Sequence, residues 1–270
     1  MDLNTIRTVL HPADRHELPP SADGDAFLAG GTWLFSEPQR DLSRLIDLQA
    51  LSWPAIVQDE ALLSIAATCT LAELDAYAAD ASWPAASLMR QCCRFLWGSF
   101  KIWNAATVGG NLCLALPAAP MAALAVALDG ACVIWTTDGS TRMVAAAGFI
   151  VGPRQSCLAP GEILHRIDLP VASLGNRFAV RQASLTTEGR SAALLIGCVG
   201  ADGFVLTVTA STPRPLRLCF AALPDASRLR RALDAGGSAA GWYDDPHGAP
   251  DWRRHMTLRL AEDIRGELAA

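Results

Sequence analysis

Two glycine pairs are the residues of this chain whose types and spacing could do chemistry. Gly30-Gly31 stands within Ala29–Thr32, and Gly109-Gly110 stands within Thr107–Asn111. Adjacent glycines permit positive φ angles and bring backbone N–H groups close to an anion, and the following Thr or Asn adds a side-chain donor. A single pair is typical of an ordinary turn. Two pairs, each placed where an extended apolar segment ends, predict two backbone cradles for the diphosphate of one dinucleotide cofactor.

Motifs for other chemistries are absent from the sequence. It contains no G-x-G-x-x-G, no P-loop, no G-x-S-x-G nucleophile elbow and no H-E-x-x-H. The histidines are dispersed, and we interpret His165, His247 and His255 as structural or surface residues. Asp244-Asp245 lies beside a proline and a glycine, which is typical of a turn rather than a metal site. We therefore predict neither a catalytic residue nor a metal ligand in this chain.

Composition and charge favour small molecules or proteins as partners. The chain has 270 residues, of which 51% are hydrophobic, and a net charge of −5, which favours neither nucleic acid nor an anionic membrane. The two longest apolar stretches are interrupted by Asp129 and Asp202, so we expect no membrane span. The N-terminus lacks a basic region followed by an apolar one, so we expect no signal peptide and a cytoplasmic location.

The cysteine pattern predicts reduced thiols. Cys92-Cys93 is the only close pair among eight cysteines, and the others stand singly in apolar surroundings, where we expect them to be buried. The C-x4-C-x2-C run of plant-type iron–sulfur proteins is absent. Any iron–sulfur cluster that works with this chain must therefore belong to another chain.

The apolar pattern predicts the elements that position the glycine pairs. We expect a strand over 26–29, a tight loop at the first pair, a helix that begins at Thr32 and a strand over 44–48, which together form a small βαβ-like unit. A strand over 62–67 precedes Thr70–Glu73, whose spacing predicts a capping box and a helix through Tyr77. A helix over 85–102 then leads into the second glycine pair, and another helix covers 117–128.

The second half of the chain predicts a hairpin, a boundary and a sheet with two helices. Asp138-Gly139, between strands over 131–135 and 141–144, is a strong hairpin signal. A strand over 162–170 precedes a boundary near 172–176. Strands follow at 177–184, 192–199 and 205–210, and helices begin at 226 and 250. In the last helix the residues Arg253, Arg254 and Glu262 lie off an apolar stripe formed by Trp252, Met256, Leu260, Ile264 and Leu268.

These motifs, in this order, resemble the FAD-binding medium subunit of the molybdenum hydroxylases, the family of xanthine dehydrogenase and aerobic carbon monoxide dehydrogenase. The resemblance covers nearly the whole chain, and its most specific part is the run from Ala106 to Leu112. The other matching segments are Leu28–Thr32, Leu45–Leu48, Thr70–Leu74, Pro117, Ala127–Asp129, Gly148-Phe149, Gly152–Arg154, Leu158, Glu162–Leu164 and Leu169-Pro170. Near the C-terminus, Tyr243–Asp245 and Trp252–His255 resemble the closing segment of that family.

The resemblance implies an α+β fold and a set of residues around FAD. Residues 1–172 would form a flavin-binding domain of the vanillyl-alcohol oxidase (PCMH) type, with subdomains of about 1–55 and 56–172, and 173–270 a small α+β C-terminal domain. Matching positions place the following residues at the cofactor: Leu28, Ala29, Gly30, Gly31, Thr32, Trp33 and Leu34 on the first glycine segment, Thr107, Gly109, Gly110 and Asn111 on the second, and Trp97, Leu158 and Arg181 elsewhere. The alternative interpretation of Trp97 is a helix core residue.

The resemblance also implies an activity and partners. The implied activity is that of an oxidoreductase subunit, which passes electrons from two [2Fe–2S] clusters on a small partner chain, through FAD, to NAD⁺, dioxygen or a quinone. The electrons would start at a molybdopterin centre on a large partner chain, in a dimer of heterotrimers. Because the chemistry belongs to the flavin, the lack of an acid–base pair or nucleophile is expected.

Two alternatives stay open, because the sequence departs from the family. Ala119-Pro120 replaces a Ser-Asp or Gly-Asp pair that helps to hold the flavin, and Leu185-Thr186 replaces a pair of arginines. A subunit that has lost FAD and acts as an assembly scaffold is therefore one alternative, against which we weigh the two intact glycine pairs. A single-chain flavin oxidase or reductase that resembles the enolpyruvyl-glucosamine reductases is the other.

Overall fold

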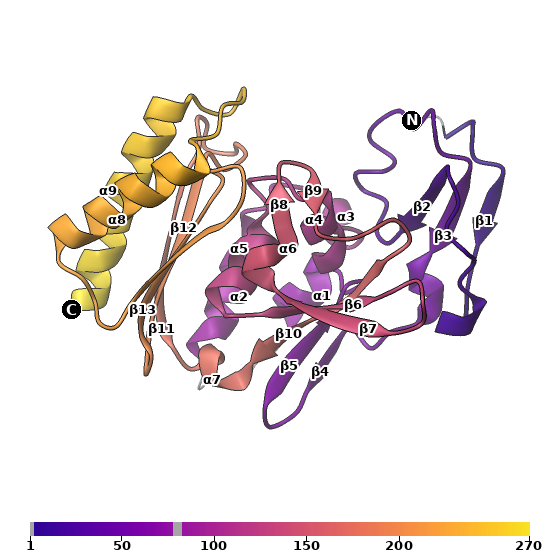
Figure 1. The fold of residues 1–270 in the computed structure, drawn as a ribbon, viewed down its shortest axis with the longest axis horizontal. Coiled ribbons are helices and arrows are strands. Elements are labelled where there is room, and N and C mark those ends of the chain that lie inside the picture. The colour runs from indigo at the N-terminus through magenta and orange to yellow at the C-terminus, as the bar shows by residue number, and fades with distance from the viewer. Residues whose placement is uncertain (1–2, 78–82) are drawn as a thin grey trace.

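The computed structural model describes residues 3–77 and 83–270, and Figure 1 shows their fold. The strands are β1 Thr8–Leu10, β2 Asp25–Leu28, β3 Arg44–Asp47, β4 Ile56–Gln58, β5 Leu62–Ala66, β6 Ala131–Trp135, β7 Thr141–Ala145, β8 Ile150–Gly152, β9 Gln155–Ser156, β10 Ile163–Pro170, β11 Arg177–Ala183, β12 Ala193–Gly200, β13 Gly203–Thr209 and β14 Leu216–Phe220. The α-helices are α1 Leu71–Ala76, α2 Pro84–Arg94, α3 Phe100–Trp103, α4 Val108–Leu114, α5 Pro120–Ala127, α6 Ala146–Phe149, α7 Val171–Leu174, α8 Ala226–Ala240 and α9 Pro250–Ala269. Two short 3-10 helices, Arg15–Glu17 and Leu48–Leu51, complete the set.

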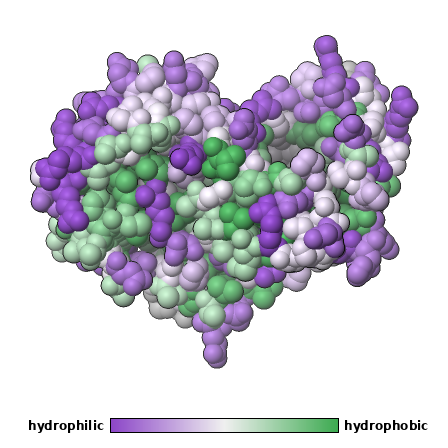
Figure 2. Space-filling model, viewed as in Figure 1, coloured by the Kyte–Doolittle hydropathy of each residue, from purple (hydrophilic) through white to green (hydrophobic). Residues whose placement is uncertain are grey.

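The elements form successive layers along the molecule. At the C-terminal end, α8 and α9 cover one face of the antiparallel sheet β11-β12-β13-β14, and α2 and α5 lie against its other face (Figure 1). The antiparallel sheet β4-β5-β10-β6-β7 follows, and the small sheet β1-β3-β2 lies at the far end. Hydrophilic residues cover much of both ends, whereas hydrophobic residues reach the surface in the middle (Figure 2). Within the described residues, no helix has both the length and the apolar content needed to cross a membrane.

The predicted βαβ-like unit is half right. Strands β2 and β3 are adjacent and parallel, with Asp25 opposite Arg44, as the pattern indicates. The helix predicted at Thr32 is wrong, because the chain makes turns there, with the N–H of Phe35 donating to the Gly31 carbonyl at 2.8 Å. Gly31 has a φ of 68°, and a proline at 38 biases the residue before it away from helix, so too few residues remain to nucleate one.

The helix predicted over 85–102 is two helices. Helix α2 ends at Arg94 and α3 begins at Phe100, after Ser99, which has the extended backbone of an N-cap residue. Gly98 lies in the break, and glycine is a poor helix former. The interruption leaves Trp97 half-exposed in the connection rather than in a helix core.

Other local predictions are confirmed. Thr70 and Glu73 form the predicted capping box, since the Thr70 N–H donates to the Glu73 carboxylate at 2.8 Å and the Glu73 N–H donates to the Thr70 hydroxyl at 3.1 Å. Strands β6 and β7 pair across the predicted hairpin, whose Gly139 has a φ of 86°. All cysteines are free thiols, but the prediction that they are all buried is wrong, because Cys113 and Cys219 are exposed.

Helix α9 buries a different face from the one predicted. The buried residues are Arg253, Thr257, Leu260, Ala261, Ile264 and Leu268, whereas Trp252 and Met256 are only partly buried. Arg253 was expected to lie off the buried stripe, yet its residue is only 1% exposed. Its burial is possible because its guanidinium is hydrogen-bonded to carbonyl oxygens of neighbouring segments.

One hydrophobic core runs through the middle layers. It joins residues of the five-stranded sheet and α2 to Leu194 and Ile196 of β12. A second core lies between the C-terminal sheet and helices α8 and α9. The chain passes between the two antiparallel sheets through α7, and the division at residue 172 stays a prediction.

Candidate functional site

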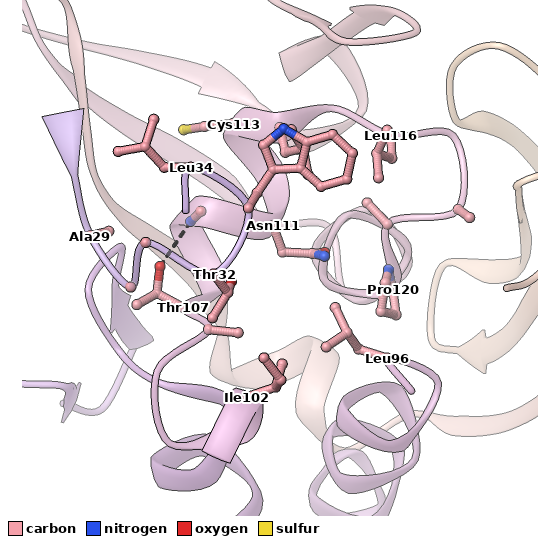
Figure 3. Close-up of a pocket in the computed structure, with 18 of the residues that line it drawn as sticks. Ala29, Thr32, Leu34, Leu96, Ile102, Thr107, Asn111, Cys113, Leu116 and Pro120 are labelled. Atoms are coloured by element: carbon pink, nitrogen blue, oxygen red, sulfur yellow. Dashed lines mark hydrogen bonds between the residues drawn. The ribbon is translucent and has the colours of Figure 1, made fainter. Parts of the chain in front are cut away.

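Both glycine segments open onto one cavity of about 700 Å³. Figure 3 shows Thr32 from the first segment and Thr107 and Asn111 from the second around the same space, with Pro120, Leu96 and Ile102 across it. The lining residues are Phe27, Leu28, Ala29, Gly30, Gly31, Thr32, Trp33, Leu34, Phe95, Leu96, Trp97, Ile102, Ala106, Thr107, Gly110, Asn111, Cys113, Leu114, Leu116, Ala118, Ala119, Pro120, Arg190 and His247. Most of them are apolar.

The first glycine segment offers backbone donors. It leaves β2 through Gly31, whose φ of 68° favours glycine. Among the described residues, the N–H groups of Gly31, Thr32 and Trp33 have no hydrogen-bond partner. Successive N–H groups of this kind make a concave site for an anion. The Trp33 ring next to them is covered by the Arg154 guanidinium, which lies 5.5 Å from the ring centroid.

The second glycine segment is not a free loop. Residues 108–111 begin α4, and each of their N–H groups already has an acceptor. The N–H of Gly109 donates to the Ala67 carbonyl at 2.9 Å, and the N–H of Gly110 donates to the Thr107 hydroxyl oxygen at 3.0 Å (dashed in Figure 3). In this structure these donors hold α4 in place, and a second backbone cradle stays a prediction.

The first glycine of each pair packs against backbone. A Cβ on Gly30 would lie 2.6 Å from the Ala105 carbonyl carbon, and a Cβ on Gly109 would lie 2.6 Å from the Ala67 Cα. Neither distance is compatible with a side chain. The contact of Gly30 with Ala105 brings the first segment beside the start of the second. These two glycines therefore have a structural use that does not depend on a cofactor.

Asn111 connects α4 to α5. Its side-chain oxygen accepts the Met121 N–H at 3.0 Å, close to the start of α5. Asn111 also lines the cavity, and its amide NH₂ group is its remaining side-chain donor. The neighbouring positions Ala119 and Pro120 add only apolar wall, since neither side chain carries a polar atom and Pro120 has no N–H. This part of the cavity therefore has a single side chain with hydrogen-bonding capacity.

The remaining predicted positions divide into two groups. Trp97 lines the cavity with half of its surface exposed, as an aromatic beside a ligand would. Gly109, Leu158 and Arg181 are not among the lining residues. Arg181 instead pairs with Glu267 of α9 and donates to the Val180 carbonyl at 2.9 Å. The structure thus gathers the other predicted residues into one site.

The C-terminal layer contributes residues that the sequence did not indicate. Arg190, from the β11–β12 connection, and His247, from the segment before α9, both line the cavity. His247 was interpreted as structural or surface, and nothing in the local pattern marks Arg190. Only the tertiary structure brings them to the glycine segments.

Arg253 fixes the two segments that carry these residues. Its guanidinium donates to the Gly248 carbonyl at 2.8 Å and to the Ala192 carbonyl at 2.9 Å, and it also reaches the Ala210 carbonyl. It pairs in addition with Asp245, whose carboxylate accepts the His247 N–H at 2.7 Å. One buried side chain therefore ties the segment of Arg190 to the segment of His247.

Comparison with known proteins gives consistent matches. The model of the family described as "FAD binding domain in molybdopterin dehydrogenase" matches residues 13–172. Among solved structures, a carbon monoxide dehydrogenase from Hydrogenophaga pseudoflava that lacks the Mo-pyranopterin moiety is 19% identical, with a TM-score of 0.81 and 96% of both chains covered. Quinoline 2-oxidoreductase from Pseudomonas putida 86 is 20% identical, with a TM-score of 0.80 and 99% of both chains covered. Reconstituted CO dehydrogenase from Oligotropha carboxidovorans is 21% identical, with a TM-score of 0.82, and the match covers 98% of this chain and 99% of that one. No curated protein matches.

These matches confirm the predicted α+β fold class, and the cavity fits the cofactor that the family name states. Its volume lies within the range of about 300–1,000 Å³ of small-molecule sites, and its apolar wall suits a flat aromatic ring. The unpartnered N–H groups of Gly31–Trp33 suit a diphosphate, and Gly110 lines the cavity without a side chain. The chain belongs to the family of FAD-binding domains of the molybdopterin dehydrogenases, which are oxidoreductases.

Proposed function

We propose that this chain is the electron-transfer subunit of a molybdenum hydroxylase complex. A small partner with two [2Fe–2S] clusters would deliver the electrons, a large molybdopterin-containing partner would generate them, and NAD⁺, dioxygen or a quinone would receive them. Bound FAD supplies the redox chemistry, since flavins exchange electrons singly or in pairs, and the protein supplies binding and orientation. We further propose a dimer of heterotrimers in the cytoplasm.

The observation that carries the proposal is the combination of an apolar cavity with a free backbone turn at one wall. Gly31, Thr32 and Trp33 would donate N–H groups to the diphosphate, and the Asn111 amide would add a side-chain donor. Trp97 and the apolar residues around it would cover the ring and exclude water. We propose that Leu158 and Arg181 act near the cofactor only after a local rearrangement, because neither lines the cavity in this structure.

We also propose that residues 1–172 form the FAD-binding unit, with subdomains of about 1–55 and 56–172, and that 173–270 form a C-terminal domain. The cavity nevertheless takes Arg190 and His247 from the second unit. We therefore expect limited proteolysis near residues 172–176 to be slowed by added FAD. Equal cleavage rates with and without FAD would contradict a cofactor site shared by the two units.

A flavin-free scaffold is the second candidate. The apolar positions Ala119 and Pro120 and the occupied donors of α4 favour it, because each removes a polar contact that a flavin could use. The packing of Gly30 and Gly109 against backbone also weakens the argument that intact glycine pairs imply a bound diphosphate. Flavin content separates the two candidates.

The test is the visible spectrum of the full chain, produced alone and with its presumed partner chains, followed by chromatography of what heat releases. We expect a flavin spectrum and released FAD. A colourless complex that assembles with the iron–sulfur and molybdenum chains and still reduces its natural acceptor would refute the electron-transfer proposal and favour the scaffold.

A further inference from the structure

The cavity has a charged wall that comes from the C-terminal layer. Among the residues that the structure describes, Arg190 is the one with a permanent charge that lines the cavity. Arg142, Arg166 and Arg253 each pair with a carboxylate. Within the same described residues, Arg190 has no ion-pair partner, and it is exposed. An unpaired guanidinium at a largely apolar cavity is available to bind an anionic ligand group.

Hydrogen bonds hold the backbone next to this charge. Arg190 lies two residues before Ala192, whose carbonyl accepts a hydrogen bond from the buried Arg253 guanidinium at 2.9 Å. The hydroxyl of Ser191, the residue between them, is bonded at 2.7 Å to the Gln182 amide of β11. The backbone directly after Arg190 is therefore held by two hydrogen-bonded contacts, and the exposed side chain is free to move.

We propose that Arg190 binds the diphosphate of the dinucleotide and replaces polar contacts that Ala119 and Pro120 do not supply. This inference rests on the proposed function. The N–H groups of the first glycine segment are neutral donors, so they bind a doubly charged diphosphate without neutralising it. Arginine offers several N–H donors in a planar arrangement that matches phosphate oxygens, and its charge strengthens each bond. The C-terminal layer thereby takes part in cofactor binding.

The experiment measures FAD affinity of the full chain from the quenching of flavin fluorescence, for wild type, Arg190→Gln and Arg190→Lys. The matched control is Arg230→Gln, which removes the same charge from α8 at a residue that does not line the cavity. Each affinity is measured at low and high salt, and thermal unfolding without FAD checks that every variant folds.

We expect Arg190→Gln to weaken FAD binding about tenfold, as for one lost charged hydrogen bond, with an unchanged unfolding temperature. Arg190→Lys should recover part of this loss, and Arg230→Gln should bind as wild type does. Added salt should weaken wild type more than Arg190→Gln, because the variant has lost the screened interaction.

Three results would overturn the inference. Wild-type affinity in Arg190→Gln would show that the guanidinium does not contact the cofactor. A loss that lysine does not relieve and salt does not alter would show that charge is not the cause. No FAD binding by the wild-type chain would refute the proposed function as well, whereas the first two results leave that function intact.

Discussion

A side chain added at Gly109 should destabilise the fold, whereas a side chain added at Gly110 should remove cofactor binding. In Gly109→Ala, the new Cβ would lie 2.6 Å from the Ala67 Cα and 2.7 Å from the Ala67 oxygen, which is backbone and cannot rotate away. The helix must move, and it loses the 2.9 Å hydrogen bond from the Gly109 N–H to Ala67. Overpacking and one lost hydrogen bond together cost about 3 kcal/mol of unfolding free energy.

Gly110→Val should leave the fold intact and remove cofactor binding. A Cβ there meets only the Thr107 hydroxyl oxygen, at 2.9 Å, so we expect a stability change within about 1 kcal/mol. The valine side chain would occupy cavity space, and a steric conflict of about 1–3 kcal/mol corresponds to a roughly ten- to hundredfold loss of FAD affinity.

Thermal unfolding followed by circular dichroism, together with FAD titration, separates the two effects. For a chain of this size, the loss in Gly109→Ala corresponds to a fall in unfolding temperature of roughly 6–12 °C. Gly266→Ala, on α9 with nothing within 4 Å of the new Cβ, is the control and should be neutral or stabilising. A Gly109→Ala variant as stable as wild type would refute the packing argument, and a Gly110→Val variant that binds FAD normally would remove α4 from the site.

Three further predictions concern residues around the site. Arg253→Met should destabilise the chain by about 3–5 kcal/mol in chemical unfolding, because it leaves buried carbonyls and Asp245 without their donor. A small effect would show that these contacts of Arg253 are dispensable. Asn111→Leu should cost about 1 kcal/mol of unfolding free energy by removing the acceptor for the Met121 N–H, and it should weaken FAD binding by removing the amide donor. Asn111→Asp should restore most of the stability, because it keeps the acceptor. Burial between two tryptophans lowers the pKa of His165 from 6.5 to about 4. The unfolded chain therefore binds the proton more readily, and stability should fall as pH decreases from about 6.5 to 4. His165→Phe should flatten the dependence of unfolding free energy on pH, and an unchanged dependence would refute the assignment.

Local sequence signals predicted local structure well. Thr70 and Glu73 form their capping box and Gly139 its hairpin turn, because both depend on residues close in sequence. The predictions at Thr32 and over 85–102 fail for a related reason. Each segment has helix-compatible residues, but the first run is confined between Gly31 and Pro38, and the second is interrupted at Gly98, so neither helix can extend.

The parts of the site that the sequence did not indicate are those made by distant segments. Arg253 looks like a surface arginine on α9, and only the carbonyls of Ala192 and Gly248 make its burial favourable. Arg190 and His247 reach the cavity because the hydrogen bonds of Arg253 hold their segments together. Periodicity along one helix carries no information about such partners, so the charged wall could not be read from it.

The glycine pairs themselves carry less information about the cofactor than their sequence pattern indicates. Gly30 and Gly109 must lack side chains for the backbone segments to pack, whether or not FAD is bound. A chain that had lost its flavin would therefore still be selected to keep both. Two glycines remain whose freedom can serve a ligand. Gly31 has a positive φ beside unpartnered N–H groups, and a Cβ on Gly110 would meet only the Thr107 hydroxyl oxygen. Substitutions at Gly110, and not at the first glycine of either pair, are consequently the ones that can distinguish an FAD-binding subunit from a scaffold with the same fold.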